Sequence, residues 1–331
     1  MDAGYERERE VAIRAVRAAA GLCRSVGAPA AAGVLDKADR SPVTVADFGS
    51  QALICQALAE AFPADPVIAE EDSAALRLPE NAVLRDRVLR SVRAARPDAD
   101  AADLLRWIDH GAAAFAPGRS WTLDPIDGTK GFLRGEQYAV ALALIVGGRV
   151  AVAAMACPNL PAEAGAVARI GAIFVAVRGR GAGVLPLDGH GDILPIRVSL
   201  RDDPASARFC ESVEAGHSAH GEAAEVAARL GIAAPAVRLD SQAKYAIVAR
   251  GEAEIYLRLP TRADYREKIW DHAAGVLIVE EAGGVVTDVA GRPLEFTHGR
   301  ELTANRGVIV TNGRLHDRVL AALNAPDRLR P

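Results

Sequence analysis

The sequence predicts a layered fold of mixed α-helices and β-strands in a chain of 331 residues. Apolar residues recur at helical spacing in the first part of the chain and again at residues 268–280, which predicts packed helices. Continuous apolar runs between residues 138 and 160 predict buried strands. A turn-rich stretch at 185–192 offers a boundary between two halves, and the length suits one large domain or two ordinary ones.

Composition and charge restrict the class of protein. Half of the residues are hydrophobic and a quarter are charged, which is the ordinary balance of a globular chain. The formal net charge of −4 argues against a nucleic-acid polymer as partner, although local basic groups can still bind a small anion. The charged N-terminus differs from a secretory leader. Because Gly147-Gly148 interrupts the longest apolar region, two strands joined by a tight turn are expected there rather than a membrane span.

The cysteines give no sign of a zinc site or a disulfide framework. None of the four belongs to a Cys-x-x-Cys pair; they are Cys23, Cys55, Cys157 and Cys210. A reduced, cytoplasmic setting is therefore expected.

The first two helices are predicted at residues 6–26 and 48–62. The polar loop between them contains two acids of interest. Asp47 lies where a helix cap would be. Asp39 has no helix to cap, so it is either a solvated loop acid or a carboxylate placed to take a proton from water.

Three consecutive acids, Glu70, Glu71 and Asp72, follow a short apolar strand at 66–69. Such acids repel one another unless a positive charge lies nearby, so this strand end either faces a metal or is solvated. Residues 73–118 then predict a helical insertion, with helices near 81–89 and 100–108 whose arginine-rich faces are expected to be solvated.

The central motif, Trp121 to Phe132, places two carboxylates three residues apart at the end of a strand. Pro125 cannot continue a central ladder, so the strand is expected to end at Asp124. Mg²⁺ commonly takes one or two carboxylates together with phosphate oxygens and waters, and Thr129 adds a hydroxyl beside Asp127. We therefore interpret the motif as a metal-dependent phosphate site; the alternative is a type I turn with two solvated acids.

After this motif the chain predicts further strands at 138–146, 149–157, 172–178 and 196–199. The glycine-rich residues 179–183 lack the spacing of a dinucleotide fingerprint and are expected to form a hairpin turn.

The second half supplies candidate anion contacts. His217 and Ser218 precede a helix near residue 222, and either can be an ordinary loop or cap residue. Ser241 and Lys244 lie at the start of another helix, whose free first-turn amides would suit phosphate. Arg258 lies within a buried strand, so it requires either a salt bridge or an anion or base contact.

Asp271 lies at the beginning of the helix predicted at 268–280, which stops at Gly283-Gly284 before a strand at 285–287. It is either an N-terminal acid stabilised by the helix dipole or a third carboxylate that meets Asp124 and Asp127 in a two-metal site.

These motifs together resemble the inositol monophosphatase superfamily of lithium-sensitive, magnesium-dependent phosphatases. The resemblance rests on Asp-Pro-Ile-Asp-Gly-Thr at 124–129, Glu-Glu at 70–71 and Trp-Asp-His-Ala-Ala-Gly at 270–275. Within the superfamily the chain is most similar to the 3′(2′),5′-bisphosphate nucleotidases. The nucleotidase-like segments are residues 37–44, 130–132, 157–159, 214–218, 240–245 and 265–271.

The resemblance implies roles for particular residues. The implied ligands of two or three Mg²⁺ ions are Glu70, Asp124, Asp127, Asp271 and the carbonyl of Ile126. Asp39 and Thr129 would activate the attacking water, with Asp47 a weaker candidate for the same network. The implied substrate contacts are Gly128, Thr129, Ser241 and Lys244 at the phosphate and His217 and Arg258 at the nucleoside.

The resemblance also implies a fold and an activity. The expected fold is a two-domain α/β/α/β/α sandwich, combining α+β and α/β parts, with domains at 1–188 and 189–331. The expected activity is removal of the 3′-phosphate from adenosine 3′,5′-bisphosphate, and also from its sulfated form, by a monomer or homodimer in sulfur metabolism. The alternatives are a phosphatase of inositol phosphates or of a specialised nucleoside phosphate, and a catalytically silent nucleotide-binding sensor.

Overall fold

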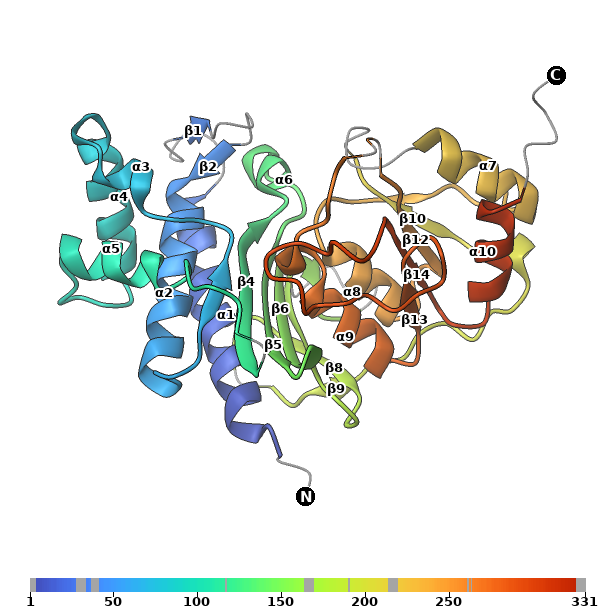
Figure 1. Ribbon diagram of the computed structural model, residues 1–331, viewed down its shortest axis with the longest axis horizontal. Coiled ribbons are helices and arrows are strands. Elements are labelled where there is room, and N and C mark those ends of the chain that lie inside the picture. Colours follow the sequence, from blue (N-terminus) through green and yellow to red (C-terminus); the bar gives the residue numbers. More distant parts are fainter. Residues whose placement is uncertain are drawn as a thin grey trace.

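The chain folds into alternating layers of helices and sheets (Figure 1). This computed structural model describes residues 4–27, 34–36, 42–116, 118–163, 170–189, 191–213, 220–260, 262 and 264–325. A seven-stranded sheet and a five-stranded sheet are separated by a layer of helices, and further helices cover both outer faces. The expected layered α+β sandwich is confirmed.

The larger sheet lies in the first half of the chain and has strand order β3-β4-β5-β6-β7-β8-β9. Its strands are β3 (Val67–Ala69), β4 (Arg119–Asp127), β5 (Ala139–Val146), β6 (Arg149–Pro161), β7 (Ile170–Val177), β8 (Ala182–Pro186) and β9 (Leu194–Pro195). Only the pairing of β3 with β4 is parallel within this sheet. The tight turn at Gly147-Gly148 and the hairpin turn at 179–183 are both confirmed, because each joins two antiparallel strands.

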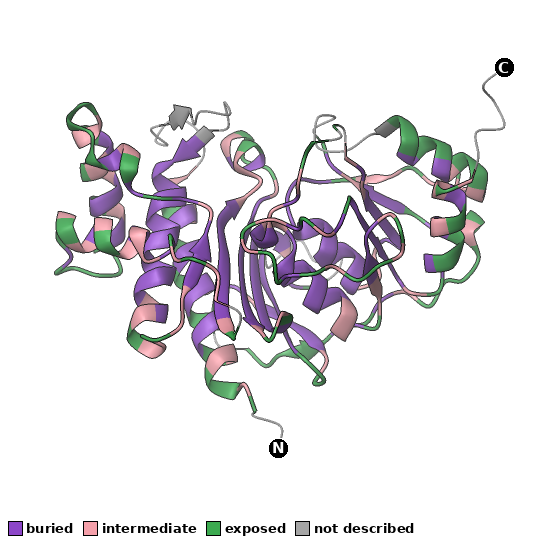
Figure 2. Cartoon of the chain, viewed as in Figure 1, coloured by how far each residue is buried: buried purple, intermediate pink, exposed green. Residues whose placement is uncertain are grey.

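Two helices cover the outer face of this sheet. They are α1 (Glu6–Val26) and α2 (Val45–Ala61). Large apolar side chains of β4 and β5, among them Trp121, Leu123 and Leu142, pack against them in one continuous core. The predicted insertion forms four short or medium helices: α3 (Ala74–Arg77), η1 (Pro79–Asn81), α4 (Ala82–Arg93) and α5 (Ala101–Asp109). Of these, α4 and α5 pack on α2, and α3 and η1 pack on α4. α2 is therefore buried around most of its surface, as Figure 2 shows.

The opposite face of the larger sheet is lined with small residues. Alternate positions of β5 carry Ala139, Ala141 and Ala143, and these pack against α8 (Ala243–Ala249) and α9 (Ala273–Glu281). Since alanine side chains are short, these two helices can lie close to the sheet. The small residues therefore bring the second half of the chain close to β4 and β5.

The smaller sheet lies on the other side of α8 and α9 and has strand order β11-β10-β12-β14-β13. Its strands are β10 (Phe209–Glu211), β11 (Val237–Arg238), β12 (Ile255–Arg258), β13 (Val285–Thr287) and β14 (Val308–Thr311). Its outer face packs against α7 (His220–Leu230) and α10 (His316–Leu323). Separately, β1 (Val34–Asp36) and β2 (Pro42–Thr44) form a two-stranded antiparallel pair just before α2.

Three local predictions are wrong. The strand expected to end at Asp124 continues to Asp127, because a bulge absorbs the proline: Asp124 pairs with Ala141 but Asp127 pairs with Ala139. Residues 196–199, expected to form a strand, do not form one; the neighbouring strand β9 ends at Pro195. The helix expected at 268–280 is broken at His272, so Asp271 belongs to a short 3₁₀ turn, η4 (Ile269–Asp271), ahead of α9.

Other features bear on the remaining expectations. The four cysteines are free and buried. Among the described residues, no helix is both long and apolar enough to cross a membrane. The predicted domain boundary at 188 falls between β8 and β9, which are neighbours in one sheet, and this boundary stays a prediction.

A paired glycine experiment tests the close approach of α9 to α8. A Cβ on Gly275 would lie 2.3 Å from Cγ of Tyr245, whereas a Cβ on Gly21 of α1 would meet no atom within 4 Å. Gly275→Ala should therefore lower the free energy of unfolding by about 1–3 kcal/mol through overpacking. Gly21→Ala should raise it by about 0.5–1 kcal/mol, because it improves helix propensity without a clash. Urea denaturation of both variants measures the two signs, and stabilisation by Gly275→Ala would contradict the packing.

Candidate metal and phosphate site

A cavity of about 150 Å³ lies between the ends of β3 and β4 and the start of α8. Apart from Asp47, every predicted site residue that the structure describes lines it. These residues are Glu70, Asp124, Ile126, Asp127, Gly128, Thr129, Ser241, Lys244, Arg258 and Asp271. Asp39 and His217 lie outside the described residues. The cavity therefore joins segments that are as much as 200 residues apart in the chain.

Five acids line this cavity: Asp240, which forms a salt bridge with Arg134, and the four predicted metal ligands, which come from three separate segments. Glu70 follows β3, Asp124 and Asp127 lie at the bulged end of β4, and Asp271 ends η4. Asp124 is only 2% exposed, and its Oδ1 atom has no hydrogen-bond partner among the described residues. Burial raises the pKa of Asp124 well above its ordinary value, and the charges of Glu70, Asp127 and Asp271 raise it further.

Asp271 experiences the same crowding. Burial raises its pKa to about 8, the neighbouring acids Asp127, Glu267 and Glu70 add to the rise, and Arg258 opposes it. Packed carboxylates of this kind are unfavourable unless they are protonated or a cation lies between them. The donors are hard oxygen atoms, and one buried carboxylate oxygen lacks a partner, so the residues fit a divalent cation.

Side chains of α2 form hydrogen bonds with the backbone near the ends of β3 and β4. The hydroxyl of Ser50 donates to the carbonyl of Pro125 at 2.8 Å, which anchors the bulge between Asp124 and Asp127. The side chain of Gln51 binds the backbone of Glu71 twice: its Nε2 donates to the carbonyl at 2.6 Å, and its Oε1 accepts from the amide at 3.0 Å. These bonds fix the backbone from which Asp124 and Glu70 project.

Asp47 takes part in the cap of α2 and also contacts Thr129. Thr44 is the N-cap of α2, and Oδ2 of Asp47 accepts from the amide of Thr44 at 2.8 Å and from its hydroxyl at 2.5 Å. The other carboxylate oxygen, Oδ1, lies 3.4 Å from the hydroxyl of Thr129. That hydroxyl also lies 3.2 Å from the carbonyl of Ile126, so it can donate its proton to either acceptor. The structure thus places a fixed, buried carboxylate next to Thr129.

The two halves of the chain meet directly beside these acids. Gly128 has a φ of 86°, and a Cβ at this position would lie 3.0 Å from Cβ of Ser241. Ser241 itself has a φ of 70°, which is uncommon for a residue other than glycine. This turn aims the amide of Gln242 at Oδ2 of Asp127, at 2.6 Å. The positive φ of Ser241 therefore allows a direct hydrogen bond from the start of α8 to Asp127.

The amides at the start of α8 are not free, contrary to expectation. The amide of Gln242 donates to Asp127, and that of Ala243 donates to the hydroxyl of Ser241 at 3.2 Å. The basic group at the start of α8 is the buried side chain of Lys244. Lys244 is 3% exposed, its Nζ donates to the carbonyl of Leu239 at 3.2 Å, and it lies 5.3 Å from the ring centre of Tyr256. Burial lowers its pKa, and the nearby charge of Asp127 acts in the opposite direction.

From sequence, Arg258 required either a salt bridge or an anion or base contact. The structure shows salt bridges. Its Nε lies 2.7 Å from Oε2 of Glu267 and its Nη2 lies 3.0 Å from Oδ2 of Asp271. Burial alone would lower the pKa of Arg258, but Glu267 and Asp271 raise it well above the ordinary value. The guanidinium is therefore charged and orients one oxygen of Asp271, while it also lines the cavity.

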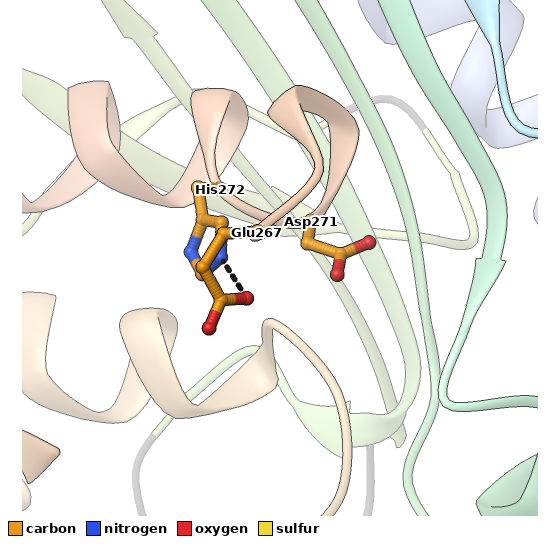
Figure 3. Close-up of side chains that lie close together, drawn as sticks. All are labelled: Glu267, Asp271 and His272. Atoms are coloured by element: carbon orange, nitrogen blue, oxygen red, sulfur yellow. Dashed lines mark hydrogen bonds and ion pairs between the residues drawn. The ribbon is translucent and has the colours of Figure 1, made fainter. Parts of the chain in front are cut away.

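The cluster of Glu267, Asp271 and His272 could by its spacing hold a metal, but its groups already have partners. The imidazole of His272 lies 3.0 Å from Glu267 through Nε2 and 2.6 Å from the hydroxyl of Tyr245 through Nδ1. Figure 3 shows the carboxylate of Asp271 turned away from the other two side chains. Burial lowers the pKa of His272, although Glu267 opposes this. Glu267 and His272 thus form a buried network that holds Arg258 next to Asp271.

Sequence reasoning missed the residues that support the site. Gln51, Gln242 and Glu267 hold its backbone or charged groups in place. Gln242 and Glu267 lie within the segments 240–245 and 265–271 that carry the resemblance, but no role was predicted for either, and Gln51 belongs to no motif. The available signal was a buried polar side chain in an apolar stretch, which requires a partner. Sequence alone does not show where that partner lies.

The raised pKa values predict how a divalent cation stabilises the chain at different pH. The folded chain without metal keeps protons on Asp124 and Asp271 at pH values where the unfolded chain has lost them. The resulting stability is present below the ordinary pKa of 3.8 and is lost as pH rises toward the raised values, about 8 for Asp271. A cation must displace these protons, so its binding should strengthen over the same range.

Thermal unfolding with and without Mg²⁺ measures this effect. The increase in Tm caused by Mg²⁺ should be larger at about pH 8.5 than at about pH 6. An equal or smaller increase at the higher pH would show that these acids do not bind the cation.

The chain is similar to known proteins over nearly its whole length. Residues 5–327 match the model of the Inositol monophosphatase family. The chain is 47% identical to a 3′(2′),5′-bisphosphate nucleotidase of Emericella nidulans, over 96% of this chain and 98% of the relative. It is 45% identical to a protein of the same name from Schizosaccharomyces pombe, over 97% of this chain and 96% of the relative.

Solved structures show the same fold at lower sequence identity. An IMPase of Thermotoga maritima superposes with a TM-score of 0.66 at 22% identity, covering 96% of this chain and 97% of that one. An inositol monophosphatase from Anabaena gives a TM-score of 0.64 at 21% identity, covering 98% of each chain. The extent of the family match and of the nucleotidase similarity shows that this chain belongs to the inositol monophosphatase family.

Proposed function

We propose that this protein is a Mg²⁺-dependent phosphomonoesterase that removes the 3′-phosphate of adenosine 3′,5′-bisphosphate. The observation that carries the proposal is the convergence of Glu70, Asp124, Asp127 and Asp271 on one cavity that also contains a buried lysine. The substrate is inferred from relatives named 3′(2′),5′-bisphosphate nucleotidase that are 47% and 45% identical over nearly the whole chain.

The four acids would hold the metal, and the carbonyl of Ile126, which lines the same cavity, is a further oxygen donor. When bound, Mg²⁺ supplies positive charge that stabilises the attacking and leaving oxygens of the phosphoryl transfer. The protein contributes fixed positions for these ligands through the bulge of β4 and through Arg258, which holds one oxygen of Asp271. The resemblance implies two or three ions.

We assign the proton transfer to Asp47 and Thr129. With its proton donated to Oδ1 of Asp47, the hydroxyl oxygen of Thr129 can accept a proton from the attacking water. The contact of 3.4 Å is long, as catalytic hydrogen bonds often are before substrate binds. The resemblance implies Asp39 for this role; it lies outside the described residues and its role stays a prediction, whereas the contact of Asp47 with Thr129 supports Asp47.

The charged and polar residues on the second-half side of the cavity would bind the substrate. The ammonium group of Lys244 can neutralise the charge of the phosphate. Ser241 and Gly128 also line the cavity, where they lie close to each other. Arg258 would face the nucleoside while it remains paired to Glu267. His217 stays a prediction for the nucleoside contact. A reduced cytoplasm suits the four free, buried thiols, and a monomer or homodimer is expected.

Phosphate release from three substrates tests the proposal. Adenosine 3′,5′-bisphosphate should be hydrolysed with Mg²⁺ and not after chelation with EDTA, and it should be preferred over inositol 1-phosphate and NADP. Preference for inositol phosphate or NADP would favour the alternative substrates. Tight nucleotide binding with no phosphate release would favour the nucleotide sensor.

The role of Asp127 gives a direct variant test. Asp127→Asn removes the charge that faces the cavity but keeps an oxygen that can accept from the amide of Gln242. Mg²⁺-dependent hydrolysis should fall by about 100-fold or more with the fold intact, since metal neutralisation of charge contributes several kcal/mol. Asp86→Asn, on an exposed part of α4, is the matched control and should keep full activity. Retained activity in Asp127→Asn would contradict the assignment.

A second pair of variants separates the two candidate proton acceptors. Asp47→Asn should lower kcat by roughly 10²–10⁴-fold, because a positioned general base contributes about that much. If Asp47 is the main proton acceptor, Asp39→Asn should lower kcat less than Asp47→Asn does. Steady-state kinetics at saturating Mg²⁺ compare the two, and circular dichroism checks that α2 keeps its helix without the Asp47 capping contact. A larger loss in Asp39→Asn would return the role to Asp39.

A further inference from the structure

Arg300 lies between β13 and β14 and is not among the residues that line the cavity. Its side chain nevertheless reaches the backbone next to one of the cavity acids. Nη2 of Arg300 donates to the carbonyl of Ala69 at 2.7 Å, and this partly buried bond spans 231 positions of the chain. Ala69 ends β3 and is followed directly by Glu70. Arg300 thus holds the strand end that presents Glu70.

The same arginine also contacts the segment that carries Asp271. Its guanidinium carbon lies 4.5 Å from the ring centre of Trp270, the residue before Asp271. Its backbone carbonyl accepts from the amide of Ile269 at 3.1 Å, and Leu302 donates to the carbonyl of Glu267 at 2.8 Å. The segment containing Asp271 is therefore fastened to Arg300 by both backbone and side chain.

These contacts bridge two acids that belong to different parts of the fold. Glu70 extends from the larger sheet, whereas Asp271 lies in η4 ahead of α9. We propose that Arg300 is a positioning residue that fixes the separation of Glu70 and Asp271 and thereby preorganises the divalent metal site. The inference rests on the proposed function, because it takes these acids as the metal ligands.

The planar guanidinium is suited to this double contact. It can stack on an indole ring while its edge donates a hydrogen bond in the plane, which a lysine ammonium cannot reproduce. Charge alone would have the opposite effect on metal binding. Arg300 is close enough to Glu70 and Asp72 to interact with them electrostatically, so loss of its positive charge would by itself favour a cation. If Arg300 positions the metal ligands, its loss should lower the affinity for the cation. If it only repels the cation, its loss should raise that affinity.

Titration calorimetry with MgCl₂ and the full chain, without nucleotide, tests the inference. Arg300→Met should raise the Kd for Mg²⁺ by about tenfold or more, as is typical when a residue that orients a metal ligand is lost. Arg300→Lys keeps the charge but not the planar contact, so it should also bind Mg²⁺ more weakly than the unmodified chain. In phosphate-release assays the Mg²⁺ concentration needed for half-maximal rate should rise, while kcat at saturating Mg²⁺ falls less.

Arg7→Met is the matched control. Arg7 also donates through Nη2 to a backbone carbonyl, that of Ala61 at 2.9 Å, and lies 5.1 Å from the ring centre of Phe62, but it is remote from the cavity. It should reproduce any general loss of stability without changing the Kd for Mg²⁺.

The outcomes distinguish the inference from the function on which it rests. If both Arg300 variants bind Mg²⁺ as tightly as Arg7→Met, or more tightly, the positioning role is wrong. If Arg300→Met does not fold, Arg300→Lys decides by the same comparison. If the unmodified chain neither binds Mg²⁺ nor releases phosphate, the proposed function fails and the inference fails with it. An active unmodified chain with unaffected Arg300 variants overturns the inference alone.

Discussion

The fold holds several carboxylate side chains close together in one largely buried cavity. Glu70, Asp124, Asp127 and Asp271 share one cavity, and the charges of the other three raise the pKa of the buried Asp124. Such an arrangement costs free energy in the empty protein, so the surrounding fold must impose it. A divalent cation removes this cost, because it replaces repulsion between carboxylates by attraction to each of them. The crowding of the acids is thus the physical reason to regard the cavity as a metal site.

The layers of the fold show how that crowding is imposed. Ser50 and Gln51 of α2 hold the backbone near Asp124 and Glu70 from one side. On the other side, alanines on the larger sheet let α8 and α9 approach closely, which brings the amide of Gln242 to Asp127. The buried network of Arg258, Glu267, His272 and Tyr245 then orients Asp271. The supports come from both halves of the chain and meet at the ends of β3 and β4.

Much of this could be predicted from residue pattern, and the failures have physical causes. Helical periodicity predicted α1 with its observed ends, Glu6 and Val26, because its apolar stripe is regular. The end of β4 was misplaced because a bulge lets a strand pass Pro125, and a bulge leaves no local mark beyond the proline itself. The motifs identified the cavity acids, but the contact of Asp47 with Thr129 could not be predicted, because it joins segments 82 positions apart in the chain. Support by Gln51 or Arg300 depends on contacts between distant segments, which a single sequence does not display.

The central claim is that four acids from separate segments bind one group of metal ions. Crystals grown with Mn²⁺ in place of Mg²⁺ test it most directly, because manganese gives an anomalous scattering signal. The account predicts anomalous peaks in the cavity, with carboxylate oxygens of Glu70, Asp124, Asp127 and Asp271 at coordination distances of about 2.0–2.3 Å. A cavity without an anomalous peak, or manganese bound elsewhere while these acids remain unliganded, would contradict it.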